Sequence, residues 1–217
     1  MARFTSAMLP IFLASSLTAG VAEARHRLPQ DSSSLAPVAE GSPTLAPFQH
    51  VRFCLRYPSD CKSDPTGNER IDLSTKNAEL LNRINRDVNA QINPIVKSHG
   101  PDLQDGWTIA PAMGDCNDYA VTKRHALLQS GLPARALRLS VVKTATGIGH
   151  LVLVVVTTKG DLVLDNLEEK IRPWQNTDYR WLKIQSATDS RFWNEIKTPV
   201  PSVSVSVANR KIRLAGR

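Results

Sequence analysis

The sequence predicts an α+β fold in which helices come first along the chain and pack on an antiparallel sheet. Two helical patterns occupy residues 74–95 and 116–129. Strand-like segments follow them, at 135–143, 150–157 and 162–164, with 181–185 as a fourth candidate. Short consecutive strands that follow helices pair most simply as antiparallel neighbours.

The first helix is predicted by one apolar stripe with spacings of three and four: Leu80, Leu81, Ile84, Val88, Ile92 and Ile95. Ser74 or Thr75 could cap its start, and Pro94 is expected to end it early. A second stripe holds Asn85, Asn89 and Asn93. It is interpreted as a polar face, with a packing or site role left open.

The second helix begins directly after Asp115, a good N-cap residue, and Asp118 stands at the third helical position as a short capping box. Gly131 and Pro133 follow its end in the usual order. Its first residue is Cys116, so that thiol is expected at a helix N-terminus, where the backbone N–H groups favour negative charge.

Residues 1–24 are interpreted as a signal peptide, with an early positive charge, an apolar stretch and Ala22-Glu23-Ala24 as the cleavage site. The apolar stretch is too short for a transmembrane helix. Residues 25–50, rich in Ser, Pro and Ala, are expected to form a flexible linker, and 51–195 the packed domain. The expected location is periplasmic or secreted.

The net charge of +7 resides mostly in residues 196–217, a predicted basic flexible tail with five cations and no acid. The domain itself shows no basic stripe interleaved with aromatic residues, which argues against a nucleic-acid partner. Two interpretations of the tail stay open: contact with an anionic envelope surface, or a solvated end.

The chain has three cysteines. Cys54 and Cys61 lie close together with Pro58 between them, and a disulfide is the natural pairing in an exported protein. Cys116 is then left over. It is either a reactive thiol, an intermolecular partner or a buried inert residue.

A nucleophilic Cys116 needs a histidine, because the flanking Asp115 and Asp118 oppose a negative charge. His150 is the best candidate, since it opens the most apolar strand. His99, in a loop, stays open as an alternative. Less suitable are the histidines of the linker region and the one that faces away on the second helix: His26, His50 and His125.

Asp165, at the end of the next strand, could orient the imidazole of His150, with Asp161 and Asn166 as weaker alternatives. A two-residue turn at 159–160 would leave Asp165 about 13 Å along the strand from His150. A loop over 157–160, or an equivalent stagger, would make the two residues diagonal neighbours at roughly 7–8 Å. We therefore expect this second register.

An oxyanion would be held by the backbone N–H of Cys116 and a second donor. The indole of Trp107 is a candidate, although packing against the domain explains that residue equally well. Zinc is not expected, because Cys-x-x-Cys and His-Glu-x-x-His motifs are absent. Gly147-Ile148-Gly149 lacks the third glycine of a dinucleotide site.

Four ordered motifs resemble the bacterial transglutaminase-like cysteine proteinases: Gly114-Asp-Cys-Asn-Asp-Tyr-Ala120, Gly131-Leu-Pro-Ala-Arg135, Gly149-His-Leu-Val-Leu153 and Leu164-Asp-Asn-Leu167. The resemblance implies a papain/transglutaminase-like fold and a catalytic triad of Cys116, His150 and Asp165. Its best-understood relatives are periplasmic calcium-dependent proteases that release biofilm adhesins. Asp115 matches one of their calcium-binding positions, and Asn117 stands where they carry an acid, so calcium is possible but not required.

The expected function is that of an exported cysteine peptidase acting on an envelope protein through an acyl-enzyme. Two alternative functions stay open. One is acyl transfer, or amidase action, on peptide or peptidoglycan amides, and the other is a non-catalytic module that binds the envelope.

Overall fold

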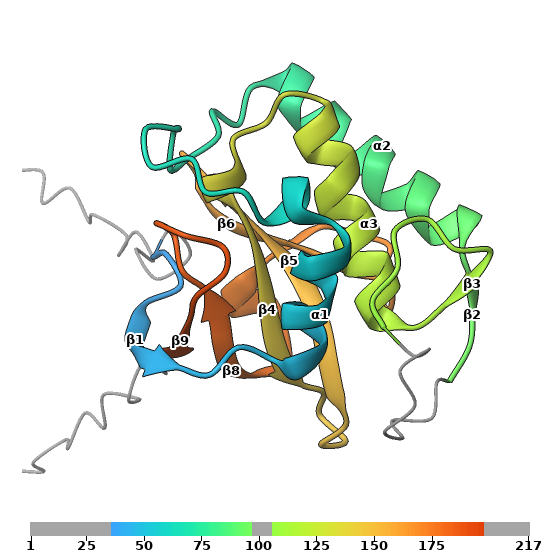
Figure 1. The fold of residues 1–217 in the computed structure, drawn as a ribbon. Coiled ribbons are helices and arrows are strands. Elements are labelled where there is room, and N and C mark those ends of the chain that lie inside the picture. Colours follow the sequence, from blue (N-terminus) through green and yellow to red (C-terminus); the bar gives the residue numbers. More distant parts are fainter. Residues whose placement is uncertain (1–35, 97–105, 198–217) are drawn as a thin grey trace, which may run out of the picture. The chain divides into compact units, whose positions relative to one another are not determined.

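The computed structural model describes residues 36–96 and 106–197 (Figure 1). This part of the chain has three α-helices, α1 (Phe48–Arg56), α2 (Thr75–Gln91) and α3 (Cys116–Gln129). A seven-stranded sheet runs in the order β1-β9-β8-β4-β5-β6-β7 with every neighbouring pair antiparallel. Its strands are β1 (Glu40–Thr44), β4 (Leu137–Lys143), β5 (Gly149–Thr157), β6 (Gly160–Leu164), β7 (Arg172–Pro173), β8 (Arg180–Gln185) and β9 (Trp193–Ile196).

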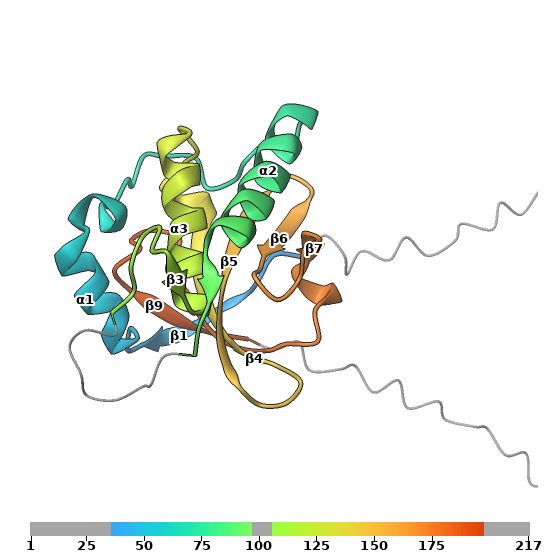
Figure 2. The same cartoon turned by 90° about the vertical axis from the view of Figure 1, so that its right-hand side faces the viewer.

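The helices cover one face of the sheet. Helix α3 packs on β4 and β5, and α2 packs on α3 (Figures 1 and 2). Side chains of β5 alternate between two cores: Leu151, Leu153 and Val155 face the helices, and Val152 and Val154 join the core of the other face. Burial on both faces explains why β5 reads as a continuous apolar run. The predicted α+β class is therefore confirmed.

Both predicted helices form, and only α2 has shifted ends. Helix α2 starts after Ser74, whose Oγ accepts from Asn77 N, and it stops at Gln91. Pro94 instead joins a short parallel pair, β2 (Asn93–Pro94) with β3 (Met113–Gly114), which leads into α3. Helix α3 spans the predicted residues, and Gly131 after its end has a φ of +83°.

The prediction of a flexible linker over residues 25–50 is wrong for the described part of that segment, because β1 and the start of α1 lie in it. Strand β1 has no alternating apolar pattern and forms through its pairing with β9. Helix α1 buries only His50 and Phe53, so it has too few core residues for a visible stripe.

The predicted signal peptide and most of the basic tail lie outside the described residues. Within the described part, no helix combines the length and apolar character that crossing a membrane requires.

The β5–β6 hairpin adopts the expected register with a tighter turn. Thr157 pairs with Gly160 and Leu153 with Leu164, so the next step places Asp165 across from Val152. Gly160 has a φ of +102°, which lets two residues close the turn where a longer loop was expected. This register brings the end of β6 to the start of β5.

Candidate active site

Cys116 is the first residue of α3, and its thiol is unpaired and half-buried. The helix start is fixed on both sides of it. Asp115 Oδ1 accepts from Asn117 N at 3.0 Å, and Asp118 Oδ2 accepts from Asp115 N at 2.9 Å. Asp118 Oδ1 also accepts from Thr108 N at 2.8 Å, which ties the preceding loop to the helix. The predicted capping box thus holds the backbone around the thiol.

His150 and Asp165 form a buried pair. His150 Nε2 lies 2.8 Å from Asp165 Oδ1, with both side chains at most 4% exposed. The Cys116 thiol is near enough to the imidazole to raise the pKa of His150. Because Nε2 faces the carboxylate, Nδ1 is the ring nitrogen available to the thiol. The start of β5 and the end of β6 therefore meet at this pair, and Cys116 at the start of α3 is near enough to affect the imidazole.

The electrostatics of this pair favour a charged imidazole. Burial lowers the pKa of His150, but the hydrogen bonds to Asp165 and Cys116 outweigh burial and raise it to about 9. Burial raises the pKa of Asp165, and its bond with His150 reverses this and leaves it below its usual value. An imidazolium next to a carboxylate is the protonation state that these neighbours stabilise.

The Asp165 segment has further support that the sequence did not reveal. The Tyr179 hydroxyl donates to Asp165 Oδ2, and its ring lies 5.6 Å from the His150 ring. Burial, then the bond to Asp165, raises the pKa of Tyr179, so the hydroxyl stays a donor. Leu167 N donates to Asp165 Oδ1 at 3.0 Å, and Asn89 Nδ2 donates to the Asp165 carbonyl at 2.9 Å.

The sequence pattern that defines the bacterial transglutaminase-like cysteine proteinases matches residues 40–200. The chain belongs to this family. The family resemblance and the transglutaminase-like fold class inferred from the motifs are thereby confirmed, and the family is one of cysteine peptidases. No curated protein matches the chain.

Solved structures of LapG from Legionella pneumophila are similar to this family member. The EGTA-treated form is 26% identical, with a TM-score of 0.45, over 51% of this chain and 63% of that one. A second LapG structure is 25% identical, with a TM-score of 0.45, over 54% of this chain and 66% of that one. The calcium-bound form is 24% identical, with a TM-score of 0.48, over 62% and 77%. The chain thus spans less than two thirds of the first two LapG chains.

The other candidate residues have structural partners. Trp107 is buried and packs against His50 and Phe53 at ring distances of 5.7 and 6.2 Å, which supports a packing role. Asp161 Oδ2 accepts from Val38 N at 2.8 Å, and His125 Nδ1 lies 2.9 Å from an oxygen of Asp60. His26 and His99 lie outside the described residues.

The Asp115 and Asn117 side chains do not fit a calcium site in this arrangement. Asp115 Oδ1 accepts the helix-capping hydrogen bond from Asn117 N. Asp115 Oδ2 accepts from Asn117 Nδ2 at 3.1 Å, so the Asn117 amide turns its nitrogen toward Asp115, whereas a calcium ion between them would need the amide oxygen there. Nearby Asp118 has both oxygens bonded to backbone N–H groups.

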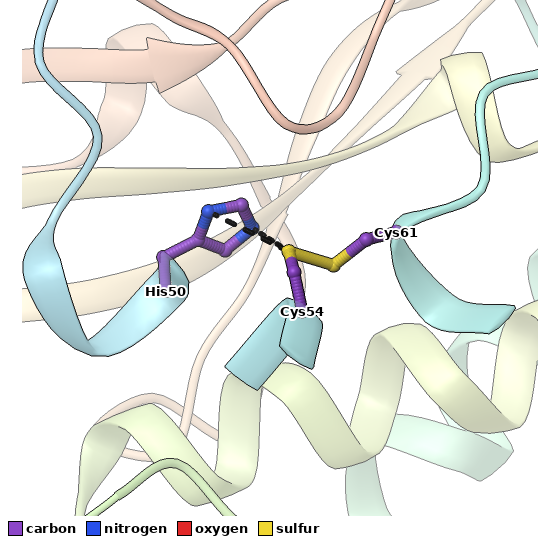
Figure 3. A group of neighbouring side chains, drawn as sticks. All are labelled: His50, Cys54 and Cys61. Atoms are coloured by element: carbon purple, nitrogen blue, oxygen red, sulfur yellow. Dashed lines mark hydrogen bonds between the residues drawn. A yellow bond between two sulfur atoms is a disulfide. The ribbon is translucent and has the colours of Figure 1, made fainter. Parts of the chain in front are cut away.

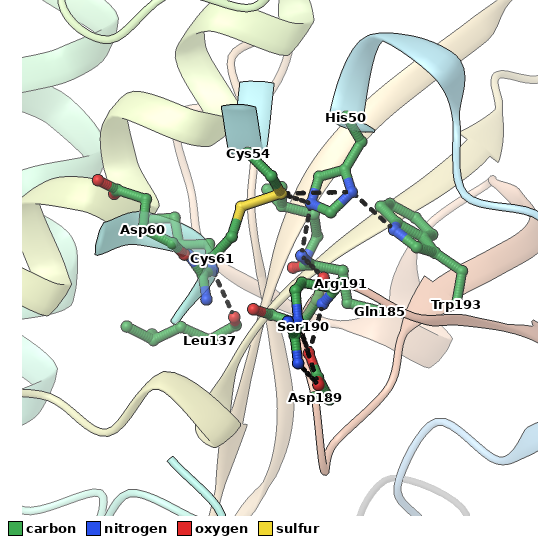
Figure 4. The surroundings of a disulfide bond; sticks show 12 residues. His50, Cys54, Asp60, Cys61, Leu137, Gln185, Asp189, Ser190, Arg191 and Trp193 are labelled. Carbon is green, nitrogen blue, oxygen red and sulfur yellow. Dashed lines mark hydrogen bonds and ion pairs between the residues drawn. A yellow bond between two sulfur atoms is a disulfide. The ribbon is translucent and has the colours of Figure 1, made fainter. Parts of the chain in front are cut away.

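The predicted disulfide is present: Cys54 and Cys61 are bonded, with Cα atoms 5.4 Å apart. His50 lies against it, and these three residues are a potential metal-ligand group (Figure 3). Two observations argue against a metal. The sulfurs are bonded to each other, and His50 Nδ1 already accepts from Trp193 Nε1 at 3.2 Å (Figure 4).

A groove of about 770 Å³ passes over the disulfide, lined by Val51, Leu55, Pro58 and Arg191 among others. Cys116, His150 and Asp165 do not line this groove. The chemistry of the nucleophile, and not the size of this groove, locates the candidate active site.

Proposed function

We propose that this chain is a cysteine peptidase that uses Cys116, His150 and Asp165 as its catalytic triad. The carrying observation is the buried hydrogen bond of 2.8 Å between His150 and Asp165, with the thiol of Cys116, at a helix N-terminus, near enough to raise the pKa of the same imidazole. Membership of a cysteine proteinase family supports the same reaction class.

In the proposed mechanism, the Cys116 sulfur attacks the carbonyl carbon of a peptide bond while His150 carries the thiol proton. The tetrahedral oxyanion is held by the N–H of Cys116, at the positive end of α3. His150 then donates its proton to the leaving amine, and the acyl-enzyme forms. Water, deprotonated by His150, releases the acyl product, and Asp165 holds the imidazole throughout.

The proposed substrate is a polypeptide of the cell envelope, and the proposed location is periplasmic or secreted. Residues 1–24 have the pattern of an export signal, and a structural disulfide suits an oxidising compartment. The basic tail is proposed to contact an anionic envelope surface.

The test compares the wild-type chain with Cys116→Ala, His150→Gln and His125→Gln. The first two should lose roughly a thousandfold or more in kcat/KM on a substrate found by envelope proteomics. His125→Gln should retain activity, because its partner is Asp60 and not the thiol. Retention of activity by Cys116→Ala on every cleaved substrate would refute the proposal. If an added amine is incorporated into the product, the reaction is acyl transfer and not hydrolysis.

Calcium removal gives a separate prediction. Because Asp115 and Asn117 hydrogen-bond each other at the helix cap, and the described residues there form no preformed oxygen cage, treatment with EGTA should change peptidase activity by less than roughly twofold. Activity assays with EGTA, and with EGTA plus excess calcium, check this. A loss that calcium restores would mean that the cap rearranges to bind the ion.

A further inference from the structure

Helix α1 carries large apolar side chains on its solvent side. Phe48, Val51 and Leu55 are 70%, 47% and 80% exposed. Around the helix axis, Val51 and Leu55 lie within about 60° of Phe48, whereas the buried His50 and Phe53 point the other way. Figure 2 shows α1 at the left-hand edge of the molecule. An ordinary surface helix has a polar outer side, so this apolar one is unusual.

The apolar side of α1 continues into the groove of about 770 Å³ that passes over the Cys54–Cys61 disulfide. Val51 and Leu55 belong to both, and Pro58 extends the apolar lining beyond the end of the helix. The exposed apolar residues are therefore neighbours on one surface and not scattered singly. Contiguous exposed apolar surface marks a place where a protein contacts another body.

Cations surround these apolar side chains. Arg52 and Arg56 lie on the same half of α1 as Phe48, at about 40° and 80° from it around the helix axis. Lys62 and Arg191 line the groove. Long basic side chains can rest their stems on apolar surface while they hold their charges farther out.

Few acidic groups offset these charges. The residues that line the groove include no acid. Asp60, the only acid between positions 45 and 62, is buried and lies 2.9 Å from His125. Asp189 pairs with Arg191 and neutralises that one cation. The surface thus combines apolar side chains with a positive charge, which complements an anionic partner.

We propose that the exposed side of α1 docks the protein on an anionic phospholipid membrane. The apolar side chains insert between the lipid headgroups, and the cations contact the phosphates. A bilayer suits this surface better than an acidic protein segment, because Phe48 does not line the groove that a segment would occupy. We name this site the α1 surface, and its members are Phe48, Val51, Leu55, Arg52, Arg56 and Lys62.

The α1 surface contains none of the proposed catalytic residues, and it lies within the folded domain, apart from the basic tail. Docking and peptide hydrolysis can therefore be tested separately. Cys116→Ala keeps the whole α1 surface, so this variant should bind vesicles like the wild type whatever its activity.

The first test is flotation of the full chain with vesicles. One set contains equal parts of phosphatidylglycerol and phosphatidylcholine, and the other contains phosphatidylcholine alone. The chain should bind the anionic vesicles at least roughly tenfold more tightly than the neutral ones. Phe48→Ser and Leu55→Ser should each weaken this binding roughly tenfold, because each removes an inserted apolar side chain. Lys62→Gln should weaken it roughly fivefold at low salt.

The matched control is Leu167→Ser. Leu167 is also exposed, at 59%, but it follows β6, near the edge of the sheet opposite β1. This variant should bind anionic vesicles like the wild type. An equal loss in Leu167→Ser and Leu55→Ser would contradict a specific docking site on α1.

Wild-type binding by both Phe48→Ser and Leu55→Ser would overturn the proposal and assign the membrane contact to the basic tail, which these variants keep. A wild-type chain that does not bind anionic vesicles would also overturn it and leave the surface to an acidic protein. Tryptophan fluorescence gives a second measurement. Compared with the wild type, Phe48→Trp should gain blue-shifted emission on anionic vesicles, and an unshifted spectrum would contradict insertion.

Discussion

Three oxygen atoms of Asp165 accept hydrogen bonds. His150 and Leu167 N approach Oδ1, Tyr179 approaches Oδ2, and Asn89 bonds the carbonyl oxygen. These partners come from the hairpin, the loop before β8 and helix α2, so the carboxylate is fixed from several sides. Such a fixed acceptor selects one imidazole tautomer, which leaves Nδ1 for the thiol.

Tyr179→Phe should lower kcat by roughly threefold to tenfold, because Asp165 loses one donor while keeping His150 and Leu167 N. KM should change little, since the hydroxyl faces Asp165. Steady-state kinetics on the identified substrate check this. Tyr57→Phe is the matched control, as it removes a hydroxyl from the aromatic cluster around Phe53. An equal loss in both variants would contradict a specific role for Tyr179.

The His150–Asp165 pair also predicts how stability depends on pH. The native pKa of His150 is raised to about 9, against about 6.5 in an unfolded chain. The native state therefore binds more protons between these values, so the pair's contribution is complete below about pH 6.5 and is lost as the pH rises to about 9. Urea unfolding from pH 6 to 9.5 should show this slope in the wild type. Asp165→Asn should flatten it, and an unchanged slope would contradict the assignment.

At the scale of elements, the two long helices have caps of different strength. Asp118 is fully buried and accepts from two backbone N–H groups, those of Thr108 and Asp115. Ser74 caps α2 at an exposed position through a bond of 3.5 Å. The start of α3 is thus part of the core, whereas the start of α2 is a surface feature.

Asp118→Ala should therefore destabilise the protein by about 2–3 kcal/mol, because it leaves two partly buried N–H groups unpaired. Ser74→Ala should cost less than about 1 kcal/mol. Midpoints of urea unfolding, converted with a common slope, give both numbers. Equal losses of unfolding free energy in the two variants would show that the buried cap stabilises the protein no more than the exposed one.

The sequence was most informative where one pattern determines one element. The capping box and the terminal glycine located α3, and apolar stripes located α2 and the strands. It failed for β1 and α1, because β1 depends on pairing with β9, far along the chain, and α1 buries only His50 and Phe53. Local patterns do not contain such long-range dependence.

At the scale of the whole molecule, the same limit applies to the candidate site. The capped helix, the strand start and the hairpin register pointed to Cys116, His150 and Asp165 from sequence. Tyr179 did not stand out, since only the assembled fold brings the loop before β8 to Asp165. The asparagine stripe of α2 was visible, but its partner segment 165–169 was not.

A second histidine joins distant parts of the fold. His50, 1% exposed, links α1 to β9 through Trp193 and to β8 through Gln185, whose Nε2 lies 3.0 Å from His50 Nε2. Burial, then the charge of Arg124, lowers the pKa of His50 to about 4. Folding therefore requires this imidazole to be neutral.

As the pH falls below about 6.5, the unfolded chain gains a proton at His50 that the native state refuses. Stability should fall by up to about 3 kcal/mol between pH 6.5 and about 4, and this contribution should then level off. Urea unfolding across this range should show a smaller loss for His50→Gln than for the wild type. If His50→Gln loses stability toward acid as steeply as the wild type, another group controls the acid sensitivity of the fold.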